Sequence, residues 1–273
     1  MNILIVGKAK TGTTIISKSI EKSMPGPKPV YYLEPKTEAE FEPVVSDRAE
    51  SKVVKIIFEH WADEPDLRRR LERREGDVVF DKVVYIVRDI RDEMISRLLY
   101  VVFPLTRKGN ATRAQHKRWI AALKAKERQP AAISFLDLCE RFATVFGTDF
   151  LKGFLANEAQ ATLDYLDVVE SSPYDKCVIK YEDFIAGSLD GLGACLGFPV
   201  AIATELDGLD RTRRSQAFDN WKSVFTPADV DFFREALGPQ LEKSGYTDWA
   251  LVPAGRLSPE HYSGYVTRLI RGA

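Results

Sequence analysis

The sequence predicts an α/β fold in which a central parallel β-sheet is flanked by helices. Apolar, β-branched runs of strand length recur along the chain, and helical patterns separate them. The run at 82–87 is apolar enough for a strand that is covered on both faces. The first run ends in a short glycine-containing turn that leads into a helical pattern, which is the order of elements in a phosphate-binding loop.

The same patterns locate the individual elements. Strands are expected at five places: 2–6, 30–33, 53–58, 82–87 and 176–180. Apolar residues recur at helical spacing after the fourth strand, so a helix is expected over 90–102. Residues 34–51 are rich in Glu and Pro and are expected to form a loop. The arginine-rich segment 63–75 is expected to be a solvated helix face or a contact surface. Residues 111–170 are expected to be mostly helical.

Composition and charge limit the class of protein. A chain of 273 residues with 45% hydrophobic content can bury a large core, and we expect a single domain over 1–273. The formal net charge of −1 provides no global field for nucleic acid. Cys139, Cys177 and Cys195 are far apart in sequence and are expected to be buried thiols in a reducing compartment. The first strand begins at Asn2 and no apolar run approaches about 18 residues, so a cytoplasmic protein without a transmembrane segment is expected.

The turn after the first strand has an unusual arrangement of charge. Gly7 and Gly12 have the spacing of the first part of a nucleoside-triphosphate loop, but Thr13 follows where that loop has a lysine. The cationic side chain lies inside the turn instead, at Lys10. Backbone N–H groups at the start of the following helix would point at a bound anion together with the positive end of the helix dipole.

Two later segments are also suited to phosphate. Arg88 lies at the carboxyl end of the fourth predicted strand, and Ser96 follows about two helical turns later. An arginine and a hydroxyl that converge on one point can bind a phosphate, although such spacing also occurs in plain helix-start salt bridges. The segment 211–222 contains four cations and a tryptophan just before a helix-start signal at Thr226. It is expected to be a ligand loop or a surface loop.

Together these segments resemble the sulfotransferases that use 3′-phosphoadenosine-5′-phosphosulfate. The residues that carry the resemblance are Ala9-Lys10-Thr11-Gly12-Thr13-Thr14, the pair Arg88 and Ser96, Tyr181-Glu182-Asp183 after the last strand, and Arg213-Arg214-Ser215 followed by Asp219-Asn220-Trp221-Lys222. The matches occur in the family's order over roughly 2–246. Ala9 replaces a proline of the family, Ser215 replaces a glycine, and the histidine of the Lys-Thr-His element of soluble eukaryotic members is not plainly present.

The resemblance implies an α/β sulfotransferase that transfers a sulfuryl group to a hydroxyl, less often an amine, and releases adenosine 3′,5′-bisphosphate. It implies donor contacts from these residues: Lys10, Thr11, Gly12, Thr13, Thr14, Arg88, Ser96, Tyr181, Arg213, Arg214 and Ser215. Lys10 would stabilise the leaving phosphate oxygen, as a cation does in phosphoryl transfer. Tyr181 would either meet the adenine edge or serve only in packing. The scheme requires no metal ion.

Two side chains compete for the role of general base, which must lie within hydrogen-bond reach of the acceptor proton. Glu34 follows the second strand, and carbohydrate sulfotransferases resemble this arrangement with a glutamate at a similar distance from the loop lysine. His60 follows the third strand, and an unperturbed imidazole is better matched to neutral pH. Lys55 would contact the donor or the base, or face solvent.

The acceptor is left open, with small molecules, lipids and carbohydrates all compatible, and so is the oligomeric state. The basic segment 107–128 is interpreted either as a mobile lid over an anionic or sugar-like acceptor, or as a basic amphipathic helix without substrate contact. Two other functions are considered. A nucleotide kinase would need a lysine at position 13 and a metal-binding acid, and a non-catalytic nucleotide-binding protein would not need Lys10 or a base.

Overall fold

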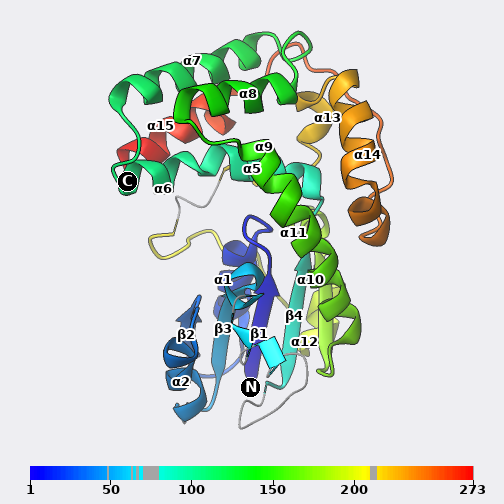
Figure 1. Cartoon of the computed structure of the whole chain (residues 1–273). Coiled ribbons are helices and arrows are strands. Elements are labelled where there is room, and N and C mark those ends of the chain that lie inside the picture. The colour runs from blue at the N-terminus through cyan, green and yellow to red at the C-terminus, as the bar shows by residue number, and fades with distance from the viewer. Residues whose placement is uncertain (48, 63, 66–67, 70–79, 210–213, 273) are drawn as a thin grey trace. The chain divides into compact units, whose positions relative to one another are not determined.

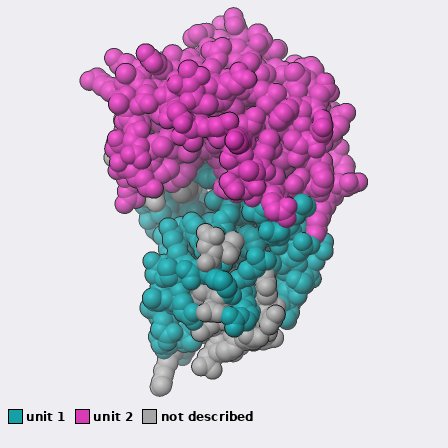
Figure 2. Space-filling model, viewed as in Figure 1, with its two compact units in different colours: residues 1–88, 161–210 teal, residues 89–160, 211–273 magenta. Residues whose placement is uncertain are grey.

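The computed structural model describes residues 1–47, 49–62, 64–65, 68–69, 80–209 and 214–272. The chain divides into two compact units. Unit 1 comprises residues 1–88 and 161–210, and unit 2 comprises residues 89–160 and 211–273 (Figure 2). Each unit is described by itself below, and the expectation of one domain over the whole chain stays a prediction.

Unit 1 contains a parallel sheet of five strands in the order β2-β3-β1-β4-β5 (Figure 1). Its elements are β1 (Asn2–Gly7), α1 (Thr13–Ser23), β2 (Val30–Leu33), α2 (Glu38–Ser46), β3 (Lys52–Ile57), α3 (Phe58–Ala62), β4 (Lys82–Val87), most of α10 (Ala159–Ser171), β5 (Lys176–Lys180), α11 (Tyr181–Ile185) and α12 (Asp190–Leu196). The predicted α/β fold with a central parallel sheet is confirmed, and so are all five strands.

The three central strands, β1, β3 and β4, are buried on both faces, toward which their side chains alternate. Ile3 and Ile5 of β1 belong to the core that also contains Ile16 and Ile20 of α1. On the other face, the hydroxyl of Tyr165 from α10 accepts the Ile86 N–H and shares its one proton between the backbone carbonyl oxygens of Val6 and Ile86, at 2.9 and 3.0 Å. Helices therefore cover both sides of the central strands.

The parallel arrangement places the carboxyl ends of all five strands at one edge of the sheet. The candidate residues of unit 1 follow the five strands at this edge: Lys10 after β1, Glu34 after β2, His60 after β3, Arg88 after β4 and Tyr181 after β5. This is the edge at which open α/β sheets bind ligands.

The regular secondary structure of unit 2 consists only of helices in its described residues. Its elements are α5 (Ile90–Tyr100), α6 (Val102–Arg107), α7 (Arg113–Arg128), α8 (Phe135–Phe146), α9 (Phe150–Gly153), the π-helix η1 (Phe154–Glu158), the first residues of α10, α13 (Trp221–Val224), α14 (Pro227–Lys243), the 3-10 helix η3 (Pro259–His261) and α15 (Ser263–Arg271). The helix predicted over 90–102 is confirmed by α5 and the start of α6. Its core is built around Met94, Trp119, Phe142 and Phe233, none of which is exposed.

One element expected from the sequence is wrong, and another lies mostly outside the described residues. Residues 34–51 are not a continuous loop, because α2 forms within them. The Thr37 side chain caps this helix by accepting from the Glu40 N–H, and Phe41 and Val44 bury one face of it. Most of the segment 63–75 lies outside the described residues.

The three cysteines are not all thiols. Cys177 of β5 and Cys195 of α12 form a disulfide, with Cα atoms 5.9 Å apart, while Cys139 is a buried free thiol. The expectation failed because α12 packs on β5, which brings together two residues that are distant in sequence. Among the described residues, no helix is both long and apolar enough to cross a membrane.

Candidate functional site

Hydrogen bonds within the protein fix the loop between β1 and α1 at consecutive residues. The Lys8 ammonium donates to Thr162 Oγ1 at 2.5 Å, and the Lys8 carbonyl accepts from both the backbone N–H and the hydroxyl of Thr11. Glu59 accepts the Ala9 N–H with both carboxylate oxygens, each at 3.1 Å. The Lys10 carbonyl accepts from Arg88 Nη1 at 2.7 Å. These contacts fix the shape of the loop before any ligand binds.

Three consecutive backbone N–H groups at the end of this loop are open. In the described part of the chain, the N–H groups of Gly12, Thr13 and Thr14 donate no hydrogen bond to a protein acceptor. They precede and begin α1, whose first backbone bond runs from Ile16 N to the Gly12 carbonyl. Open donors at a helix N-terminus, supported by the helix dipole, form an anion-binding site.

Lys10 has a backbone conformation that is rare for a residue with a side chain. Its φ is +71°, which is in the left-handed region, and this typically costs about 1–2 kcal/mol. The Arg88 contact to its carbonyl holds the backbone there. The other lysine of this loop, Lys8, is directed to Thr162.

Tyr181 and Arg88 brace the other side of the loop. The Arg88 guanidinium lies 4.1 Å from the centre of the Tyr181 ring, and both residues are buried. The Tyr181 ring packs directly on Gly12, where an added Cβ would come within 2.3 Å of Tyr181 Cδ2. The packing role considered for Tyr181 is therefore present, and a contact of Tyr181 with adenine stays a prediction.

This close approach gives a testable difference between two glycines. Gly12 has a φ of +89° and Gly26 a φ of +90°, but a Cβ at Gly26 would have no atom within 4 Å. Substitution of either by alanine is expected to cost about 1–2 kcal/mol of backbone strain. Gly12→Ala should cost about 1–3 kcal/mol more, because the methyl group overlaps Tyr181. Chemical denaturation of both variants measures this difference, and equal losses would contradict the packing described here.

Glu34 is bound to a buried lysine. Lys55 Nζ donates to Glu34 Oε1 at 2.5 Å and to Thr14 Oγ1 at 2.9 Å, and Lys55 is 2% exposed. The lysine therefore links the loop to the candidate base, and the expectation that it would face solvent is not met. Burial of Glu34 would raise the pKa of its carboxyl group, but the charge and hydrogen bond of Lys55 outweigh burial and lower it.

His60 lies in the short helix α3, directly after β3. Its Nδ1 is buried and has no hydrogen-bond partner among the described residues. Burial lowers the pKa of His60, and the Lys36 charge lowers it further. The neighbouring carboxylates of Glu34 and Glu59 oppose this shift without cancelling it. The imidazole is therefore neutral at pH 7 and able to accept a proton.

The segments that carry the two candidate bases are tied together. Trp61 Nε1 donates to the Pro35 carbonyl at 2.8 Å, and Trp61 is 1% exposed. Glu34 precedes this proline and has a φ of +53°, so it too is held in the left-handed region. Sequence reasoning identified Glu34 and His60 separately but did not find this link.

Unit 2 contains a second candidate anion-binding group. The Arg214 side chain is 9% exposed, and neither Nη atom meets an acceptor with hydrogen-bond geometry in the described part of the chain. The guanidinium lies near the Tyr262 ring, at 5.7 Å from its centroid. A buried, unmatched guanidinium is costly unless an anion binds to it. Ser96 is buried in α5, Ser215 is half-buried, and Arg213 lies outside the described residues.

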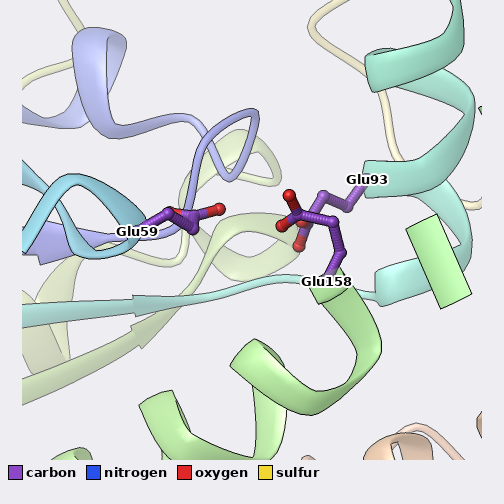
Figure 3. A group of neighbouring side chains, drawn as sticks. All are labelled: Glu59, Glu93 and Glu158. Carbon is purple, nitrogen blue, oxygen red and sulfur yellow. The ribbon is translucent and has the colours of Figure 1, made fainter. Parts of the chain in front are cut away.

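Carboxylates that the sequence analysis did not single out hold several of these segments. Asp92 accepts the Trp221 N–H at 3.0 Å and Asn220 Nδ2 at 3.1 Å, which fixes the end of the segment 214–222 in unit 2. Figure 3 shows Glu59 beside the loop of unit 1, and Glu93 and Glu158 of unit 2. Arg97 joins the two carboxylates of unit 2, at 2.8 Å from Glu93 and 2.9 Å from Glu158. The only sequence feature that could have pointed to Glu59 is its position directly after the predicted strand 53–58.

No protein-family model matches the chain, and no curated protein matches its sequence. Among solved structures, the chain is similar to the mouse sulfotransferase SULT7A1 in a crystal structure of its complex with PAP. The two share 16% sequence identity, the match covers 88% of this chain and 84% of that chain, and the TM-score is 0.49. At this identity and TM-score the likeness bears on neither activity nor ligand.

Proposed function

We propose that this chain is a sulfotransferase that uses 3′-phosphoadenosine-5′-phosphosulfate as its donor. The observation that carries the proposal is the loop after β1, where three open N–H groups lie beside a lysine that is built into the loop. Thr13 stands where a triphosphate loop has its lysine, so the cation is displaced toward the middle of the loop. Such a loop suits a ligand with one phosphate and one sulfuryl group.

In this proposal, the N–H groups of Gly12, Thr13 and Thr14 bind the 5′-phosphate, with the Thr11, Thr13 and Thr14 hydroxyls nearby. Lys10 stabilises the charge that develops on the leaving phosphate oxygen. The sequence resemblance assigns the 3′-phosphate to Arg88, Ser96, Arg213, Arg214 and Ser215. The unmatched Nη atoms of Arg214 support an anion at that residue. The assignments of Ser96, Ser215 and Arg213 stay predictions.

The proposed reaction is an in-line displacement at sulfur. The acceptor oxygen forms a bond to sulfur while the bond from sulfur to the bridging phosphate oxygen breaks, and the electron pair of that bond leaves with adenosine 3′,5′-bisphosphate. The acceptor proton passes to a base on the protein. Positive charge on Lys10 meets the negative charge on the leaving oxygen, so this step needs no metal ion.

The surroundings of the two candidate bases differ in a way that favours His60. The Glu34 carboxylate is held in an ion pair with Lys55 and its pKa is lowered, which makes it a weaker base. His60 is neutral at pH 7 because its pKa is also lowered, and its Nδ1 is free of protein partners among the described residues. We propose that His60 accepts the proton and that Glu34 and Lys55 organise the loop through Thr14.

The pH dependence of turnover distinguishes the two bases. If His60 is the base, turnover should fall as the pH drops through a pKa that lies below 6.5, since the imidazole becomes protonated there. If Glu34 is the base, the fall should occur only below 4.5, because its pKa is lowered from that value. Transfer from radiolabelled donor, followed between pH 4 and pH 8, measures the position of this fall.

Two variants complete that experiment. His60→Gln should lower turnover by about 10²–10⁴-fold and remove the fall in turnover that wild type shows below pH 6.5. Glu34→Gln should retain that fall. A wild-type profile that stays flat until the pH is below 4.5 would contradict the assignment to His60 and leave Glu34 as the base.

A nucleotide kinase is the main alternative. It is disfavoured by Thr13 and by Glu59, whose carboxylate occupies the Ala9 N–H and places negative charge in the first half of the loop. A non-catalytic nucleotide-binding protein is the third possibility, and Lys10 together with a neutral candidate base at His60 argues against it. Incubation with radiolabelled donor and pooled acceptors separates these functions: labelled acceptor supports the sulfotransferase, and release of no bisphosphate product contradicts it.

The acceptor is proposed only as a class, a small molecule, lipid or carbohydrate that offers a hydroxyl. A cytoplasmic location also stays a prediction. The disulfide between Cys177 and Cys195 does not fit the reducing compartment that was expected from the three cysteines.

A further inference from the structure

Helix α7 of unit 2 has two faces of opposite character. Trp119 and Leu123 are buried in the core of the unit, and the helix packs on α8 and α15. At 3.6 residues per turn, four cations on the other side fall within an arc of about 60° and along about 22 Å of the helix. These four residues, all exposed, are Arg113, Lys117, Lys124 and Arg128. We call them the basic stripe.

The positive charge of the basic stripe is not neutralised within the protein. The one acid of α7, Glu127, is buried, and its Oε1 accepts the Ser263 N–H at 2.7 Å. None of the four cations forms an ion pair with a residue in the described ranges. Lys222, by contrast, lies 2.9 Å from Asp219 and 2.7 Å from Asp248. The stripe is therefore a local positive surface on a chain whose net charge is −1.

The helix cannot change its orientation to hide these charges. Its first turn is fixed by a capping box, in which Thr112 Oγ1 accepts the Gln115 N–H and the Gln115 side chain accepts the Thr112 N–H. Trp119 packs edge-on against Phe142 of α8, at 5.1 Å between ring centroids. These contacts hold α7 in the core of unit 2, so they do not favour the mobile lid that was one of the two interpretations of the segment 107–128.

The composition of the stripe selects the kind of partner. Its apolar face is already used in the core, so no large apolar side chain remains to enter a bilayer. The stripe carries no aromatic or amide side chain that could stack on bases or read their edges. The stripe lies on a helix, so a peptide cannot bind to it by adding a strand to the edge of a sheet. A row of long cationic side chains, about 6 to 10 Å apart along the axis, matches a stiff chain that carries anionic groups at intervals.

We propose that the basic stripe binds a linear acidic polysaccharide, one that bears sulfate or carboxylate groups along its length. The partner binds by ion pairs from Arg113, Lys117, Lys124 and Arg128 and lies along α7. This binding does not depend on the transfer reaction proposed above, so the two proposals fail separately.

The test compares two variants of the full chain that have the same net charge. The stripe variant carries Arg113→Gln, Lys117→Gln, Lys124→Gln and Arg128→Gln. The control variant carries Lys28→Gln, Lys152→Gln, Lys243→Gln and Arg256→Gln, which are exposed cations outside α7. Binding of heparin is measured by calorimetry at 50 and 200 mM salt, with duplex DNA and anionic lipid vesicles as the other two probes.

We expect heparin affinity of the wild-type chain to fall about 100-fold between the two salt concentrations, as for about four ion pairs. The stripe variant should bind about 100-fold more weakly than wild type at 50 mM salt and lose most of its salt dependence, while the control variant keeps at least a third of the wild-type affinity. Equal losses in the two variants would overturn the proposal, and so would stripe-dependent binding of DNA or vesicles that is as tight as that of heparin. If circular dichroism shows that the fourfold stripe variant is unfolded, the double variant Lys117→Gln and Lys124→Gln is tested instead. Its expected loss of heparin affinity is about 10-fold.

Discussion

Replacement of Lys10 by alanine is expected to lower the rate of sulfuryl transfer by about 10²–10³-fold, because the developing charge on the leaving oxygen loses its cation. The backbone should be little affected, since alanine and lysine have similar strain at a φ of +71°. The Arg88 contact to the residue-10 carbonyl is also kept. The rate is measured with radiolabelled donor under single-turnover conditions.

A lysine with no part in the loop provides the control for this result. Lys28 has a side chain that is 81% exposed, and Lys28→Ala should retain the wild-type rate. If Lys10→Ala transferred sulfuryl groups at more than about a tenth of the wild-type rate, the assigned role of Lys10 would be wrong. The identity of the donor would then have to be argued from the open N–H groups alone.

The second large effect concerns the stability of unit 2. Asp229 is fully buried, and its carboxylate accepts the N–H groups of Phe135, Leu136 and Thr226 at 2.7–3.0 Å. It thereby satisfies the start of α8 and closes the capping box of α14. Asp229→Ala should lower the free energy of unfolding by about 3–5 kcal/mol, because each buried N–H that loses its partner costs about 1–3 kcal/mol.

Asp137 is the matched control for Asp229. It lies in the capping box of the same helix α8 but is exposed. Asp137→Ala should cost only about 1 kcal/mol. Urea denaturation followed by tryptophan fluorescence measures both, since Trp119, Trp221 and Trp249 lie in unit 2. Similar losses in the two variants would show that Asp229 does not join the two helices as described.

The sheet was predictable because its signal is local. Buried strands such as 82–87 are continuous apolar runs, and a parallel order places the residues that follow them at one edge. Helix α2 was missed because Glu and Pro dominate its composition, and only Phe41 and Val44 mark its buried face. The disulfide was missed because the approach of Cys177 to Cys195 depends on how α12 packs on β5.

The candidate site shows the same division. Lys10, Glu34, His60 and Arg88 were found because each follows a strand in the sequence. Their contacts were not, since the pairing of Lys55 with Glu34 and of Glu59 with Ala9 depends on distances across the sheet edge. Long-range packing, and not residue type, determines which of these side chains form ion pairs or hydrogen bonds within the protein.

The central claim is that the loop after β1 holds a phosphosulfate donor instead of a metal–triphosphate complex. Titration calorimetry of the wild-type chain with adenosine 3′,5′-bisphosphate in the absence of magnesium tests it most directly. The account predicts micromolar or tighter binding of the bisphosphate that Gly12→Ala weakens, and much weaker binding of ATP with magnesium. Tight binding of magnesium–ATP together with no heat from the bisphosphate would contradict it.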